Sequence, residues 1–160
     1  MSSAQGGPED FDAVVLAAHA DQSLAMLVDA SQAEREILGA FPYQRNDTIL
    51  HVDCSLLPRC RRAWASWNYR VPREEGQPVV LTYNLNRLQG HVSPVPICIT
   101  LNGTRWIDET QILRRIEYHH PVYSREAIAA QKRFHEINGR NRTYFCGAYW
   151  GHGFHEDGVN

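Results

Sequence analysis

The residues of this chain whose types and spacing could do chemistry gather near its carboxyl end. Residues 143–149 form a β-branched and aromatic run, Gly151 and Gly153 follow, and the acidic pair Glu156 and Asp157 comes next. This order is typical of a strand, a tight turn and the start of a helix. The first N–H groups of a helix have no partner within it, so they can bind an anionic or electron-rich ligand group. The acidic pair could also do acid/base work, but carboxylates in a first helical turn are expected from the helix dipole alone.

Three other kinds of site have weaker support in the sequence. A metal site would have to combine Cys54, Cys60, Cys146, His152 and His155. Their spacing matches neither a structural zinc motif nor the HExxH helix, so we expect no metal. Cys146 lacks the Gly-x-Cys-x-Gly turn of an exposed nucleophile and is expected to be a buried strand cysteine. Gly151-His-Gly153 is not a G-x-G-x-x-G loop, because position 156 is glutamate.

Composition narrows the class of protein. The chain has 160 residues, 43% of them hydrophobic and 21% charged, which is typical of a soluble globular domain. A net charge of −2 gives no basic excess, so we expect no nucleic-acid partner. The longest apolar run, residues 13–18, is far shorter than the roughly 20 residues of a membrane span. Four cysteines without a secretory signal are expected to be free thiols in a cytoplasmic protein.

The first part of the chain predicts one strand and two helices. Residues 1–10 are small and polar and are expected to be a flexible lead-in. The apolar run at residues 11–18 predicts a strand buried on both faces of a parallel sheet. Asp21 is expected to cap a short helix, and Ser31-Gln-Ala-Glu34 is a capping box that opens a second helix running to about residue 38.

From residue 46 the pattern changes to short β-branched and aromatic runs separated by Pro and Gly, which predicts an antiparallel sheet. The expected strands are residues 48–53, 63–69, 79–86, 97–101 and 112–119. A helix over residues 124–137, capped by Ser124, and a strand over residues 143–149 follow. Aromatic residues on the expected strands could line a pocket or belong to the core; they are Trp64, Trp67, Tyr69 and Tyr83. The class is α+β, with an antiparallel-sheet domain flanked by two strands of parallel type.

Six segments follow one another in an order found in a known family. They are FDAVVLAAHADQSLAML, YQRNDTILHVD, WASWNYR, LTYNLNRLQG, HPVYSREAIAAQ and YFCGAYWGHGFHEDGV. Along nearly the whole chain they resemble the C-terminal portion of a predicted NAD/FAD-binding oxidoreductase of the flavin-containing amine oxidase superfamily. The most similar branch is the one associated with cyclopropane fatty acid synthases. The resemblance implies a parent enzyme with an FAD-binding α/β domain and an antiparallel substrate domain.

The resemblance also assigns the parts of the chain. Residues 11–22 would be a returning strand and loop of the FAD-binding domain, residues 23–142 the substrate domain, and residues 143–160 the closing strand and flavin-facing helix start. The G-x-G-x-x-G region of the FAD-binding domain has no counterpart in these 160 residues. We therefore expect a fragment that needs the missing FAD-binding domain, in cis or in trans, and that is inactive alone.

Site residues follow from the same resemblance. The residues implied to contact FAD are Gly147, Ala148, Glu156, Asp157, Gly158 and Val159. Phe154 would lie on the substrate side of the flavin, and His51 is a weaker candidate for substrate contact. The implied function is the substrate-domain and flavin-capping part of an enzyme that oxidises a small or lipid-like substrate by hydride transfer to flavin N5. The alternative is a non-catalytic α+β module that binds a small apolar ligand or a protein partner.

Overall fold

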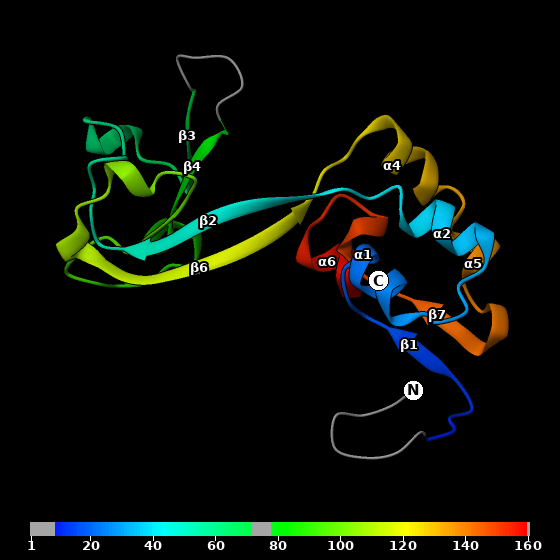
Figure 1. Cartoon of the computed structure of the whole chain (residues 1–160). Helices are drawn as coiled ribbons and strands as arrows, with labels where there is room; N and C mark the ends of the chain where they lie inside the picture. Colours follow the sequence, from blue (N-terminus) through cyan, green and yellow to red (C-terminus); the bar gives the residue numbers. More distant parts are fainter. Residues whose placement is uncertain (1–8, 72–77, 160) are drawn as a thin grey trace. The chain divides into compact units, whose positions relative to one another are not determined.

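The computed structural model describes residues 9–71 and 78–159 (Figure 1). The chain forms two compact units, the first from residues 1–44 and 121–160 and the second from residues 45–120. Helices and a small parallel sheet make up the first unit, and an antiparallel sheet makes up the second, which confirms the α+β class. The expected lead-in, residues 1–10, lies mostly outside the described residues. No helix in the described part of the chain has the length and apolarity needed to cross a membrane.

The small sheet of the first unit joins β1 (Val14–Leu16) to β7 (Thr143–Phe145) in parallel. The parallel pairing agrees with the strand type expected from the sequence. The expectation of burial on both faces is wrong, because Leu16 and Phe145 are buried whereas Val15 is 63% and Tyr144 43% exposed. The core of the first unit covers only one face of these two strands.

Two helices precede the second unit in the chain, α1 (Ala20–Met26) and α2 (Gln32–Leu38). The capping box of α2 is confirmed, since Ser31 Oγ accepts from Glu34 N at 3.2 Å and Glu34 Oε2 accepts from Ser31 N at 2.7 Å. The expected cap of α1 is wrong, because His19 precedes the helix and Asp21 lies in its first turn. Gln22 contributes to this helix start, because its Oε1 accepts a hydrogen bond from His19 N at 3.2 Å.

The helix expected at residues 124–137 forms as two pieces, α4 (Arg125–Gln131) and α5 (Phe134–Ile137). Ser124 caps α4 as predicted, with its Oγ accepting from Ala127 N at 3.1 Å. The helix is interrupted because Arg133 N bonds to Ala130 O at 2.9 Å, a tighter turn than an α-helix makes. These helices enclose the core of the first unit, whose buried residues are Leu16, Ala20, Ile37, Leu38, Phe41, Ala127, Ala130, Ile137, Phe145 and Tyr149.

The second unit is built on a five-stranded sheet with the order β3-β4-β5-β2-β6 (Figure 1). Its strands are β2 (Tyr43–His51), β3 (Trp67–Arg70), β4 (Val80–Asn84), β5 (Cys98–Leu101) and β6 (Ile112–Pro121). The pairs β3–β4, β4–β5 and β2–β5 are antiparallel, as predicted. The strand expected at residues 79–86 stops at Asn84, whose side chain accepts from Arg87 N and starts α3 (Leu85–Leu88). Short 3-10 helices occupy Arg61–Ala63 (η1), Thr104–Trp106 (η2) and Glu109–Gln111 (η3).

Candidate functional site

The segment after β7 has the strand, turn and helix order that the sequence predicts. The strand ends earlier than residue 149, because Gly147 turns the chain into a 3-10 helix at Ala148–Trp150 (η5). A side chain at Gly147 has no room, since a Cβ there would lie 2.6 Å from Cε1 of Tyr149. The chain then enters α6 (His155–Val159). Glycine is therefore required at position 147 to make this turn.

Two parts of the implied cofactor surface come together although they are separate in sequence. Helix α6 lies against η5, and a Cβ placed on Gly158 would lie 3.7 Å from Ala148 N. Gly147 and Ala148 thus share a surface with Gly158 and Val159. Gly147 and Ala148 are half-buried, whereas Gly158 and Val159 are exposed. Glu156 is exposed on the same helix.

Asp157 has a structural role in this segment. Its Oδ2 accepts hydrogen bonds from Phe154 N and His152 N, both at 2.9 Å. The hydrogen bond from Phe154 N is the largest cause of a lowered Asp157 pKa; burial, the next cause, acts in the opposite direction, and the hydrogen bond from His152 N lowers the pKa further. The N–H groups of His152 and Phe154, which precede α6, are therefore bound by the protein's own carboxylate. Asp157 positions the turn, and a ligand anion would be repelled at this point.

Two residues that the sequence analysis did not select hold the turn to α4. Gln131 Nε2 donates to the carbonyl oxygens of Tyr149 at 2.9 Å and Gly151 at 2.6 Å. The hydroxyl of Tyr123 donates to Ala148 O at 3.4 Å. A signal for Gln131 was present in the sequence, because it follows Ala127 by four residues and so shares the inner face of the helix. A long polar side chain on such a face needs a partner inside the protein.

His51 and Phe154, the two implied substrate contacts, belong to different units. Phe154 is 56% exposed beside α6. His51 is fully buried, and its Nε2 is 2.8 Å from Thr100 Oγ1, which is 2.9 Å from Thr82 Oγ1. Burial lowers the pKa of His51, with Asp53 acting in the opposite direction. His51 is therefore neutral near pH 7, and it could contact a substrate only after the residues that cover it moved.

The sheet of the second unit buries a polar face. Across the three neighbouring strands β2, β5 and β4, His51 pairs with Cys98, and Cys98 pairs with Asn84. Two residues further along β5, Thr100 pairs with Thr82 of β4. All five are buried. On β3, Trp67 is 51% and Tyr69 60% exposed. The sequence left open whether these aromatic residues belong to the core or line a pocket. Because Trp67 and Tyr69 are exposed, their assignment to the core is wrong.

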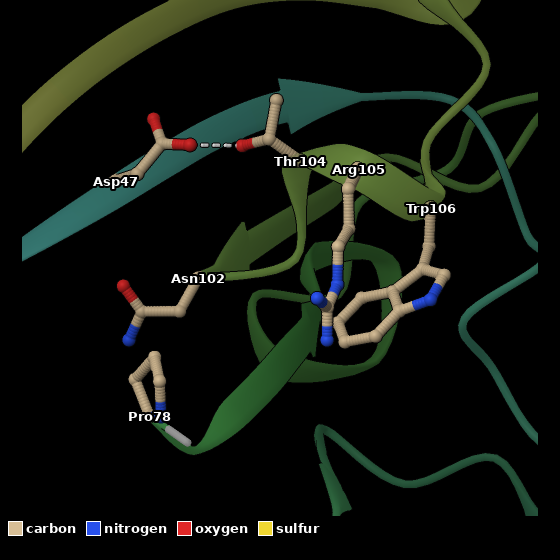
Figure 2. Close-up of a pocket in the computed structure, with 6 residues that line it drawn as sticks. All are labelled: Asp47, Pro78, Asn102, Thr104, Arg105 and Trp106. Atoms are coloured by element: carbon tan, nitrogen blue, oxygen red, sulfur yellow. Dashed lines mark hydrogen bonds between the residues drawn. The ribbon is translucent and has the colours of Figure 1, made fainter. Parts of the chain in front are cut away.

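A hollow of about 390 Å³ in the second unit is shown in Figure 2. Its lining residues are Asp47, Pro78, Asn102, Thr104, Arg105 and Trp106. The Thr104 hydroxyl donates to the Asp47 carboxylate, and the Arg105 guanidinium carbon lies 4.0 Å from the centre of the Trp106 ring. These groups contact one another, and the lining contains no histidine or cysteine that could act as a nucleophile or base.

No group of three or more His, Cys, Asp or Glu side chains in the described part of the chain is arranged to hold a metal ion. A comparison with models of known protein families matches no family, and a search of curated proteins finds no match. The similarity to flavin-dependent oxidoreductases therefore stays a prediction, to be judged on the geometry of the closing segment and the small parallel sheet.

Proposed function

We propose that this chain is the substrate-binding and flavin-capping part of an FAD-dependent oxidoreductase of amine oxidase type. The observation that carries the proposal is the parallel pairing of β1 with β7. The whole second unit lies between these two strands in the sequence. This connectivity is expected where an antiparallel substrate domain is inserted between two strands of an α/β domain.

The exposed side of the small sheet gives further support. Val15 and Tyr144 are adjacent in the register and both are exposed. Parallel sheets are normally covered on both faces, and a two-stranded sheet is marginally stable on its own. We infer that further strands and helices of an FAD-binding unit cover this side and supply the pyrophosphate site.

The closing segment fits a cofactor that is held through backbone contacts. Gly147, Ala148, Gly158 and Val159 would provide these contacts, because η5 and α6 bring them together. When bound, FAD supplies the hydride acceptor. Asp157 keeps the turn in shape, and the exposed ring of Phe154 offers an apolar surface to a small or lipid-like substrate.

A cytoplasmic location is part of the proposal. All four cysteines are free: Cys54, Cys60, Cys98 and Cys146. Free thiols are typical of proteins in a reducing compartment, where glutathione and thioredoxin keep cysteines reduced.

The test is co-expression of the full chain with the FAD-binding unit of an oxidoreductase of this superfamily. We expect a yellow complex with a flavin absorption spectrum, whereas the chain alone should be colourless. Val15→Lys places a charge on the exposed face of β1 and should prevent the complex from forming. Val28→Lys is the matched control, because Val28 is also an exposed valine of the first unit but lies outside the sheet.

Three results would contradict the proposal. The first is a wild-type pair that retains no flavin, which the alternative of a non-catalytic module predicts. The second is equal loss of the complex in Val15→Lys and Val28→Lys. The third is a flavin spectrum in the purified chain alone. Circular dichroism of both variants distinguishes a lost interface from a lost fold.

A further inference from the structure

A second pocket of the second unit, of about 540 Å³, lies beside β3. It is lined by Ser55, Leu56, Leu57, Pro58, Arg59, Ala63, Ala65, Trp67, Asn68, Tyr69 and Arg70. Strand β3 is at one end of the strand order, so the pocket is next to a strand that pairs on one side only among the described strands. A volume of this size is typical of sites for small molecules.

The segment that lines the pocket is rich in arginine. Residues 54–71 contain Arg59, Arg61, Arg62 and Arg70 and no aspartate or glutamate. Asp53 immediately precedes this segment, and its carboxylate accepts hydrogen bonds from Ser55 N and Asp108 N. All four arginines are exposed. Among the described residues, the ion pairs are formed by Arg45, Arg115, His119 and Arg133, and none joins the four arginines of this segment to a carboxylate. Positive charge is therefore concentrated here without a described acidic partner.

Aromatic rings support two of these arginines. The guanidinium carbon of Arg70 lies 5.0 Å from the centre of the Trp106 ring, and that of Arg61 lies 5.5 Å from the centre of the Trp64 ring. Trp64 is fixed in turn, because its Nε1 donates to Pro58 O at 2.7 Å. A guanidinium group held near an aromatic ring still has N–H groups that can bind a carboxylate or phosphate in a bidentate manner.

The pocket also offers apolar surface. Of its lining residues, Leu57 is buried and Leu56 is half-buried. The Trp67 ring is exposed and packs edge-on against Tyr83, with the ring centroids 5.5 Å apart. Trp67 and Tyr69 present exposed aromatic rings to the hollow that they line. The lining thus combines apolar walls with guanidinium groups.

We propose that this pocket binds a small molecule that joins a phosphate or carboxylate group to an apolar body. Arg59 and Arg70 bind the anionic group, and Leu56, Leu57 and Trp67 contact the apolar body. The inference concerns the second unit alone and does not depend on flavin binding.

Isothermal titration calorimetry of the full chain with octyl phosphate tests the proposal, with inorganic phosphate and 1-octanol as the two half-ligands. Octyl phosphate should bind at least about tenfold more tightly than either half-ligand, since it uses both kinds of contact. Arg59→Gln and Arg70→Gln should each weaken it about five- to tenfold, as expected for a charged hydrogen bond at a partly solvated site. Arg114→Gln is the matched control, because Arg114 is an exposed arginine of β6 outside the pocket.

The proposal is overturned if octyl phosphate binds no better than 1-octanol, or if Arg114→Gln weakens binding as much as Arg59→Gln. A second arm uses phosphatidylcholine vesicles with and without phosphatidylglycerol. Binding to the anionic vesicles without binding to soluble octyl phosphate would assign the arginines to a membrane surface and refute a small-molecule site. Since no arm measures flavin, a negative result here leaves the flavin proposal to its own test.

Discussion

Removal of the Thr100 hydroxyl should destabilise the second unit. Thr100 Oγ1 is bonded to both His51 Nε2 and Thr82 Oγ1, and all three residues are buried. Thr100→Val leaves two buried polar groups without this partner. Each such loss costs about 1–3 kcal/mol, so we expect the two together to decrease the free energy of unfolding by about 2–6 kcal/mol.

Urea unfolding at pH 7.5, followed by tryptophan fluorescence, measures the effect. For a unit of this size the decrease corresponds to a midpoint lower by about 1–3 M. The control is Thr48→Val, because Thr48 is equally buried but its hydroxyl makes only a 3.4 Å contact with Asn46 O. The control should cost under about 1 kcal/mol. An equal decrease in the free energy of unfolding for Thr100→Val and Thr48→Val would refute the role assigned to the Thr100 hydroxyl.

The hydrogen-bonded side chains of His51, Thr100 and Thr82 also predict that the stability of the second unit depends on pH. Burial lowers the pKa of His51 below 6.5, so the unfolded state binds a proton more readily than the folded state. This contribution to stability is complete above pH 6.5 and decreases as the pH falls towards the lowered folded pKa. His51→Leu should reduce the loss of stability between pH 7.5 and 5.5. An unchanged pH profile in that variant would contradict the assignment.

Three further predictions concern local features. Ser31→Ala breaks the capping box and should cost about 1 kcal/mol in thermal unfolding, whereas an unchanged midpoint would refute the cap. Cys98, whose pKa is raised to about 12 by burial, should resist a thiol reagent at pH 8 while exposed Cys60 reacts; equal rates would contradict this. Asp157→Ala should speed hydrogen exchange at His152 N, because it removes the acceptor of that group. The lowered pKa of Asp157 predicts faster exchange at His152 N also when acidification protonates this carboxylate, and unchanged exchange in the variant would contradict the role of Asp157 in the turn.

The sequence was sufficient for the local features of the fold. The capping box at Ser31 and the Ser124 cap formed as predicted, because a cap depends on residues three positions apart. The short β-branched and aromatic runs, separated by Pro and Gly, predicted the antiparallel sheet, because strands and turns also depend on residues close together in the sequence. The order of strand, turn and helix after residue 143 was also evident from the residue types.

Tertiary structure decided which strand faces are exposed to solvent and which polar groups are free to bind a ligand. Val15 is exposed and His51 is buried because of segments distant in sequence that cover one side of a strand and not the other. The turn also brought the Asp157 carboxylate within hydrogen-bond distance of His152 N and Phe154 N, a pairing that the residue order did not predict. Residue types and short spacings determined the elements of this protein, whereas burial and hydrogen-bond pairing across the fold determined what each candidate residue can do.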